Sequence, residues 1–153
     1  MKIVIIGGGP AGLMAAEAAS RAGAEVDLYD AMPSVGRKFL LAGKGGLNLT
    51  HSEPLDVFLS RYGSRRAPLD PIIQSFGPDA IRDWAAGLGI KTFVGTSGRV
   101  FPTDFKAAPL LRDWLRRLRK SGVRFHVRHR WLGWDEQEML RFLTPAGERS
   151  VGA

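Results

Sequence analysis

Cysteine is missing from this 153-residue sequence, and so is any stretch long and apolar enough to read as a transmembrane helix. The lack of cysteine excludes disulfide bonds, thiolate metal sites and redox relays through a cysteine pair. Internal repeats and low-complexity linkers are absent as well. Neither a spacing typical of metal ligands nor a Ser/His/Asp set rises above chance. We therefore predict no metal site and assign no catalytic residue.

The amino-terminal residues resemble a signal peptide only superficially. Lys2 is followed by uncharged residues as far as Ala16, but three consecutive glycines and a proline lie among them. These residues would break the helical core of a signal peptide. We therefore expect a strand followed by a helix in this segment, and a cytoplasmic protein without a membrane partner.

Positive charge exceeds negative charge, with a formal net charge of +7 and 44% hydrophobic residues. The length suits one domain, and the hydrophobic content supports a folded core. A basic patch can indicate a nucleic-acid partner. Here the basic residues near position 120 lie in the last turn of an expected helix, where positive charge complements the helix dipole. We therefore predict no nucleic-acid partner. The basic residues concerned are Arg112, Arg116, Arg117, Arg119, Lys120, Arg124, Arg128 and Arg130.

The most informative segment is Gly7-Gly8-Gly9-Pro10-Ala11-Gly12, which follows the apolar run Ile3–Ile6. The pattern G-x-G-x-x-G between a strand and a helix is typical of dinucleotide-binding proteins. The first glycine permits a tight turn, the second lets a pyrophosphate approach the main chain, and the third lets helix and strand pack closely. Main-chain amides and the helix dipole then face an anion. The alternative is a glycine-rich turn in an unrelated α/β protein.

A second strand is expected at Glu25–Asp30, and it ends on an acidic residue. The acid lies roughly 20 residues beyond the glycines, as expected for the group that binds a ribose. The Asp30 carboxylate can accept hydrogen bonds from both ribose hydroxyls and would repel a 2′-phosphate. The sequence therefore favours FAD or NAD over NADP.

The remaining pattern completes an α/β fold. We predict helices at 54–62, 69–75, 78–87 and 107–120, ended in the first three cases by Gly63, Gly77 and Gly89. A hairpin is expected at 91–94 and 99–101, a further parallel strand at 123–127, and an antiparallel meander at 131–134, 139–143 and 148–151. The fold class is a Rossmann-like domain with a small meander. Because the run Ile3–Ile6 would form an open sheet edge, we expect the domain to be incomplete.

Three segments together resemble the BaiN-like, or aminoacetone-oxidase-like, bacterial NAD(P)/FAD-dependent oxidoreductases. They are Gly7–Gly12 with Asp30, the stretch GRKFLLAGKGGLNLTHSEP from Gly36, and GRVFPTDFKAAPLL from Gly98. Many members carry T-G-x-G-R-C-N where this chain has Ala42–Asn48, so the substrate does not transfer. The resemblance covers nearly all of the chain. It implies that residues 1–153 are the amino-terminal segment of an FAD-binding domain with a helical insert at about 52–90. The substrate-binding domain and the carboxy-terminal FAD segment are then expected elsewhere in the same protein.

Residues and resemblance together yield a set of candidate FAD contacts. The glycine turn is expected to bind the pyrophosphate, and Asp30 with the neighbouring main chain is expected to bind the adenosine ribose. A basic pair is expected to neutralise the phosphate charge. A loop at 42–49 is expected to border the flavin ring, and the resemblance places a residue after the third parallel strand near adenine. The set is Gly7, Gly9, Pro10, Ala11, Gly12, Asp30, Ala31, Arg37, Lys38, Ala42, Gly43, Asn48, Leu49 and Trp131.

The expected function is an FAD-dependent oxidoreductase segment that is inactive alone, with a small-molecule substrate and NAD(P)H as a candidate electron donor. Two alternatives stay open. The first is an NAD-binding dehydrogenase domain, against which the second glycine cluster at 42–49 argues. The second is a shortened, non-catalytic nucleotide-binding module. His51 is the histidine nearest the expected flavin loop, where an imidazole can shuttle protons, although a loop residue without chemistry is the simpler interpretation.

Overall fold

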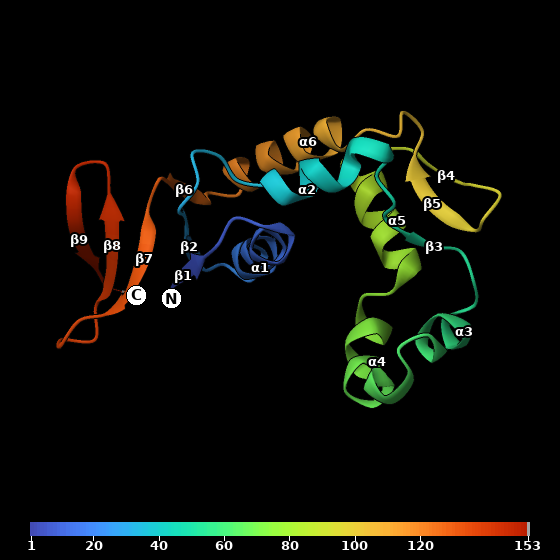
Figure 1. The fold of residues 1–153 in the computed structure, drawn as a ribbon, viewed down its shortest axis with the longest axis horizontal. Coiled ribbons are helices and arrows are strands. Elements are labelled where there is room, and N and C mark those ends of the chain that lie inside the picture. Colours follow the sequence, from blue (N-terminus) through green and yellow to red (C-terminus); the bar gives the residue numbers. More distant parts are fainter. Residues whose placement is uncertain (153) are drawn as a thin grey trace. The chain divides into compact units, whose positions relative to one another are not determined.

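The computed structural model describes residues 1–152, and the chain divides into two compact units. The first unit joins Met1–Leu41 to the residues from Trp114 onward, and the second is Ala42–Asp113. Figure 1 labels the elements of both units. Within residues 1–152, no helix is long and apolar enough to cross a lipid bilayer.

A parallel sheet forms the centre of the first unit. Strands β1 (Lys2–Ile6), β2 (Glu25–Asp30) and β6 (Arg124–Val127) pair in the order β1-β2-β6. All pairs are parallel, with Ile6 opposite Tyr29 and Asp30 opposite Val127. The predicted strands, including the one expected at 123–127, are confirmed. Among the described residues β1 has a partner on one side only, as its predicted edge position requires.

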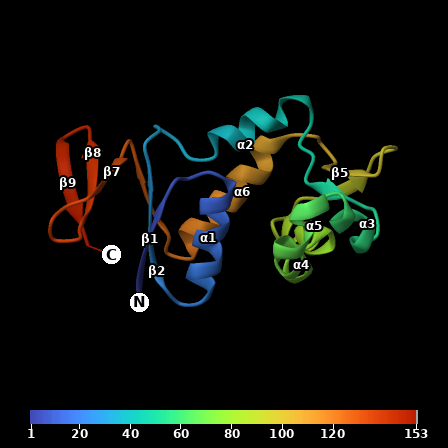
Figure 2. The ribbon, with the colours of Figure 1, turned by 60° about the horizontal axis from the view of Figure 1, so that its bottom comes forward.

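Helix α1 (Pro10–Arg21) lies along β1 and β2, as Figure 2 shows. It buries Leu13 and Ala16 but also the carboxylate of Glu17, which is 3% exposed. Trp114 of helix α6 (Ala107–Lys120) donates its indole N–H to Glu17 Oε2 over 2.7 Å. A buried carboxylate needs such partners because burial without them is costly. The bounds predicted for the helix at 107–120 are confirmed.

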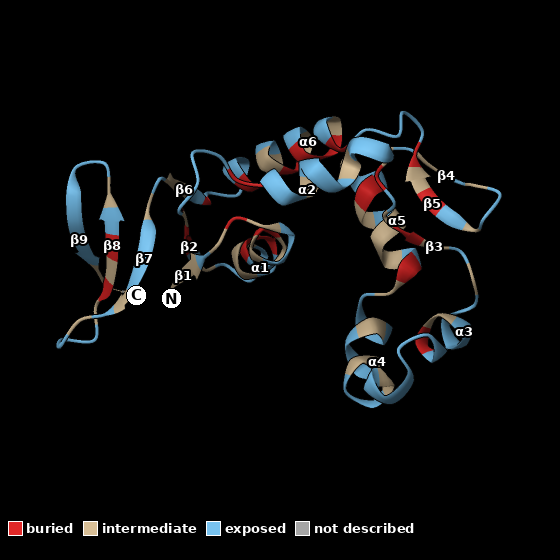
Figure 3. Cartoon of the chain, viewed as in Figure 1, coloured by how far each residue is buried: buried red, intermediate tan, exposed pale blue. Residues whose placement is uncertain are grey.

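An antiparallel meander completes the first unit. It consists of β7 (Arg130–Trp134), β8 (Leu140–Thr144) and β9 (Gly147–Val151), paired in that order. Leu140 and Phe142 of β8 pack with Tyr29 of β2 in a buried cluster. The rings of Tyr29 and Phe142 stack with centroids 4.3 Å apart. The meander was predicted, and its packing against the parallel sheet explains why β8 buries Leu140 and Phe142 while Arg141 is half-buried and Leu143 is exposed. Figure 3 colours the strand by this burial.

The second unit is built from short elements. After α2 (Arg37–Ala42), whose last residue begins this unit, come a 3₁₀ turn at Gly43–Gly45, β3 (Thr50–His51), α3 (Leu55–Ser60), a second 3₁₀ turn at Gly63–Arg65, α4 (Arg66–Ser75) and α5 (Pro78–Gly87). Strands β4 (Thr92–Val94) and β5 (Arg99–Pro102) form the predicted hairpin, and β3 extends it to a sheet in the order β3-β5-β4.

Two elements were not predicted, since the segment 37–42 is helical and Thr50–His51 is a strand. Gly77 follows Phe76, the C-cap of α4, as predicted, and it is also the N-cap of α5, with Pro78 at the first helical position. Gly89, with φ +80°, follows the end of α5 as predicted. The predicted helical insert at about 52–90 contains α3, α4 and α5, and its status as an insert stays a prediction.

Candidate functional site

The glycine turn joins β1 to α1 in the first unit. Gly7 has φ +102°, a conformation that favours glycine, and its N–H donates to the Tyr29 carbonyl over 2.7 Å. Gly9 is the N-cap of α1 and has no side chain to occupy the amides of the first helical turn. Pro10 follows at the first helical position, and the first-turn residues include no acid. The turn therefore presents the positive end of a helix without an acidic side chain of its own.

Gly12 and Gly9 of the motif differ in the space around them. A Cβ on Gly12 would lie 1.9 Å from the Gly7 carbonyl oxygen, so helix and turn approach too closely for any side chain. A Cβ on Gly9 would meet no heavy atom within 4 Å. Gly9 is thus not needed for the packing of the chain itself. Its bare main chain faces open space, which is the geometry that the approach of a diphosphate requires.

Asp30 ends β2 and reaches back to the glycine turn. Its Oδ2 accepts the Gly8 N–H over 2.6 Å, and its Oδ1 accepts the Met32 N–H over 2.7 Å. These two bonds fix the carboxylate in place. A carboxylate has about four acceptor positions, so both oxygens retain capacity for ribose hydroxyls. Ala31 stands between Asp30 and Met32 in the sequence and is exposed.

The sequence did not assign roles to Gly8, Val35 and Gly36. The Gly36 N–H donates to the Gly8 carbonyl over 2.7 Å, and a Cβ on Gly8 would lie 2.3 Å from Val35 Cγ1. Gly36 has φ +72°. The segment after β2 therefore packs directly on the middle glycine of the turn. The middle glycine of the Gly7–Gly9 run was the available signal, because G-x-G-x-x-G itself requires no glycine at Gly8.

A cleft of about 230 Å³ opens beside this turn. Arg37 and Lys38, in the first turn of α2, are exposed at its margin, and neither forms an ion pair with an acidic side chain of residues 1–152. Two cations beside uncapped helical amides favour an anionic ligand. The lining residues are Gly8, Gly9, Asp30, Met32, Ser34, Gly36, Arg37 and Lys38.

The segment after β6 hydrogen-bonds the same end of β2 through the main chain of Arg128 and His129. The Arg128 N–H donates to the Met32 carbonyl over 3.0 Å, and the His129 N–H donates to the Asp30 carbonyl over 2.9 Å. Arg128 has φ +59°, an uncommon conformation for a residue other than glycine. Trp131 lies on β7, 42% exposed, with its ring against Trp134. Arg128 and His129 therefore lie beside Asp30.

The predicted flavin loop lies in the second unit and is described by itself. A Cβ on Gly43 would meet the Ala107 Cβ at 2.4 Å, so the loop begins in close contact with the start of α6. The Leu49 N–H donates to the Val100 carbonyl over 2.9 Å. With its amide nitrogen oriented as donor, Asn48 bonds the carbonyls of Thr50 and Val100. The loop is thus held against β5 by main-chain and side-chain bonds. Ala42 is exposed at the end of α2.

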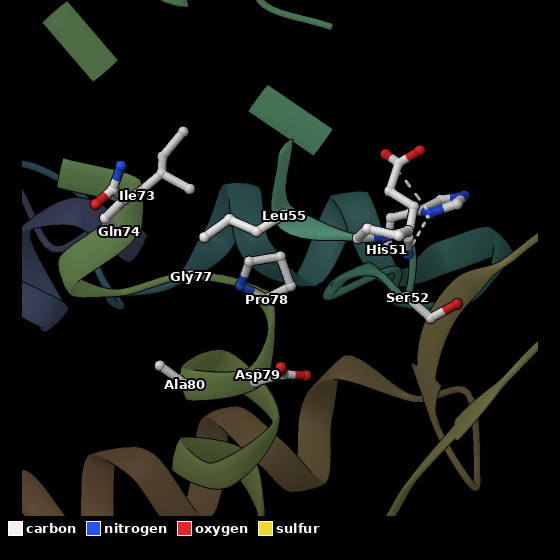
Figure 4. Close-up of a pocket in the computed structure, with 11 residues that line it drawn as sticks. His51, Ser52, Leu55, Ile73, Gln74, Gly77, Pro78, Asp79 and Ala80 are labelled. Atoms are coloured by element: carbon white, nitrogen blue, oxygen red, sulfur yellow. Dashed lines mark hydrogen bonds and ion pairs between the residues drawn. The ribbon is translucent and has the colours of Figure 1, made fainter. Parts of the chain in front are cut away.

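His51 lies at the margin of a separate cleft of about 430 Å³ in the same unit (Figure 4). Its Nδ1 accepts the Glu53 N–H over 3.2 Å, and its Nε2 lies 3.0 Å from the Ser97 carbonyl. Both ring nitrogens are therefore engaged by main-chain groups. The Arg61 guanidinium, which bonds both oxygens of Glu53, holds the pKa of that carboxyl below its usual range. These contacts give the imidazole a structural role in this corner of the unit. Within residues 1–152, no group of three or more potential ligands is arranged to hold a metal ion.

Known structures share this architecture. A flavocytochrome c3 fumarate reductase in its open conformation matches 99% of this chain and 32% of its own, with a TM-score of 0.75 and 17% identity. A 3-ketosteroid-delta4-(5alpha)-dehydrogenase from Rhodococcus jostii RHA1 matches 98% of this chain and 43% of its own, with a TM-score of 0.65 and 17% identity. At these identities the likeness shows the fold alone.

Sequence comparison identifies the family. The 3-dehydro-bile acid delta(4,6)-reductase of Clostridium scindens is 31% identical over 128 residues, which cover 82% of this chain and 31% of the relative. The chain therefore spans about a third of the length of this curated relative. A family model described as the HI0933-like protein Rossmann domain matches residues 1–152. Because that match covers the described chain from end to end, the protein belongs to the HI0933-like protein Rossmann domain family.

Proposed function

We propose that this chain is the nucleotide-binding segment of an FAD-dependent oxidoreductase. The observation that carries the proposal is the pairing of Gly9, open to space, with an Asp30 carboxylate anchored beside it. This arrangement suits a dinucleotide whose diphosphate lies over the turn and whose ribose lies at the acid. The names of the relatives support the choice of FAD, since they include a reductase, a flavocytochrome and a steroid dehydrogenase.

The residues present fit such a cofactor. The amides of Ala11 and Gly12 face the diphosphate from the first turn of α1, and Arg37 and Lys38 offset its negative charge. Asp30 accepts the ribose hydroxyls. When bound, FAD accepts a hydride from a donor, with NAD(P)H as the candidate, and passes electrons to a small-molecule substrate or to oxygen. The protein orients the cofactor by these contacts.

The finer assignment is the BaiN-like group, on the motifs from Gly36 and Gly98. In this assignment the loop Ala42–Leu49 borders the flavin ring, and the main chain after β6 contacts adenine. We place the substrate-binding part and the other flavin contacts in the part of the protein that corresponds to the remaining two thirds of the relative. The unpaired edge of β1, where Ile6 is 43% exposed, is a position at which such a part could add a strand. We further propose a cytoplasmic location, without nucleic-acid or membrane partners.

The test is a titration of the purified chain with FAD, NAD and FMN, followed by flavin fluorescence or calorimetry. We expect FAD to bind more tightly than FMN, because FMN lacks the adenosine that Asp30 contacts. The D30N variant presents an amide N–H to a main-chain N–H, so FAD affinity should fall by roughly tenfold or more. Asp104 makes a comparable bond to the Lys106 N–H in the second unit, and D104N is therefore the matched control. Tight binding of NAD without binding of FAD would instead favour a dehydrogenase domain.

A further inference from the structure

A second cleft in the first unit, of about 620 Å³, lies between α6, β6 and the segment 33–35. Its volume falls within the range of small-molecule sites, about 300–1,000 Å³. Six of its nine lining residues are apolar and three are polar or charged, and two of the apolar ones, Val35 and Val123, are buried. The lining residues are Pro33, Ser34, Val35, Leu115, Arg119, Val123, Arg124, Phe125 and Val127. Of these residues, only Ser34 also lines the cleft of about 230 Å³ beside the glycine turn.

Two arginines line this cleft, and they differ in their partners. Arg124 is compensated, because its guanidinium donates to both oxygens of Asp27 and to Glu25. Arg119 instead lies over the Phe125 ring, with Cζ 5.3 Å from the ring centroid. Among residues 1–152, no acidic side chain lies within ion-pair distance of Arg119. The cleft therefore combines an apolar floor with one uncompensated positive charge.

The surroundings of Arg119 strengthen this charge. Lys120 and Arg112 are also exposed on the same helix, with Asp113 Oδ1 3.8 Å from Arg112 Nε, and the chain as a whole carries a formal net charge of +7. A cleft with low-dielectric walls and charges of one sign attracts ligands of the opposite sign. Apolar surface alone would accept a neutral molecule equally well. The position of Arg119 over the aromatic floor is what selects for an anion.

We propose that this cleft binds a small amphiphilic anion, in which a carboxylate is carried on a hydrocarbon body. The carboxylate pairs with the Arg119 guanidinium, for which a bidentate contact is available. The hydrocarbon covers Leu115, Val123 and Phe125. This site is additional to the proposed FAD function and does not depend on it, since the two clefts share one lining residue.

The test is a titration of the full 153-residue chain with sodium octanoate, followed by the amide resonances of Val123, Phe125 and Val127. We expect saturable shifts confined to the cleft. R119Q should weaken octanoate binding by roughly tenfold, the effect of losing one charge-assisted hydrogen bond, and R119K should recover part of it. R112Q removes the same charge from the same helix two turns away, and it should change the affinity less than twofold.

Three results would overturn the proposal. One is equal affinity for octanol and octanoate, which would show that the Arg119 guanidinium does not contribute to binding. Another is equal weakening by R112Q and R119Q, which would indicate a diffuse field and no defined site. The last is a dimer in sedimentation velocity that R119Q dissociates and octanoate does not, which would make a second copy of the chain the occupant. Octylamine should not bind, and FAD affinity, measured in parallel, should be unchanged by R119Q.

Discussion

The steric difference between Gly12 and Gly9 makes a sharp prediction about the glycine turn. In G12A, the new methyl group would begin 1.9 Å from the Gly7 carbonyl oxygen. Ordinary carbon–oxygen approaches are about 3.3–3.6 Å, so α1 must move by more than about 1 Å from the turn. Overpacking of this kind costs about 2 kcal/mol, which lowers the melting temperature by roughly 4–8 °C in a chain of this size. The movement also displaces the amides for which we propose contact with the diphosphate.

G9A is the matched substitution. Its Cβ meets no heavy atom within 4 Å, and its φ of −79° suits alanine. Folding stability should therefore change by less than about 1 kcal/mol, because the restriction that alanine places on the unfolded chain offsets its poorer propensity for the N-cap position. The methyl group occupies the space through which a diphosphate approaches, so FAD or ADP affinity should still fall at least tenfold.

The assay is urea unfolding of each variant together with a nucleotide titration. G12A should lose both stability and binding, whereas G9A should lose binding alone. If G9A binds FAD as tightly as the parent chain, the diphosphate does not lie over Gly9, and our account of the site is wrong. If G12A is as stable as the parent, the contact between α1 and the turn is looser than the structure indicates.

Two further predictions concern the first unit. The Asp27 side chain is 4% exposed and accepts two hydrogen bonds from the Arg124 guanidinium. His126 Nε2 lies 2.7 Å from Asp27 Oδ1. The Arg124 guanidinium lowers the pKa of the Asp27 carboxyl below its ordinary 3.8. Because the folded-state pKa is depressed, this group stabilises the fold above about pH 4 and loses that contribution as the pH falls further. Urea unfolding between pH 7 and pH 2.5 should therefore show a shallower acid dependence in R124Q, and an identical dependence would contradict the assignment. W114F removes the indole donor to Glu17 and should cost about 1–3 kcal/mol in thermal unfolding. W134F, on an exposed ring, should stay within about 0.5 kcal/mol, and a larger loss there would show that indole removal itself destabilises.

Local patterns were sufficient for much of the fold. The apolar run before three glycines predicted β1 and the turn, because a strand buried on both faces needs continuous apolar residues. Helix α5 begins at a proline and is followed by Gly89, two signals that depend only on neighbouring residues. The bounds of α6 followed from its amphipathic period and its basic last turn. In each case the residues that indicate where an element begins or ends lie within that element or within one turn of it.

Elements that depend on distant partners could not be predicted in the same way. Strand β3 has two residues and exists because it pairs with β5, about 50 positions later. The burial of Glu17 was not predicted, because its partner Trp114 lies 97 positions later in the sequence. The contacts of Arg128 and His129 could not be predicted from the sequence, because their main chain bonds to Met32 and Asp30 only when β6 lies beside β2. The role of Trp131 stays a prediction.

The sequence by itself determined that a strand, a glycine turn, a helix and a terminal acid follow one another at the spacing of a dinucleotide site, because main-chain conformation and spacing are local properties. Only the tertiary structure decided that Gly9 faces open space while Gly12 does not, and that Asp30 is anchored to Gly8 and Met32. It also decided that Arg119 lies over the Phe125 ring, with no acidic side chain of residues 1–152 within ion-pair distance. These facts depend on which atoms meet across the fold, and close packing between distant segments is what brings them together.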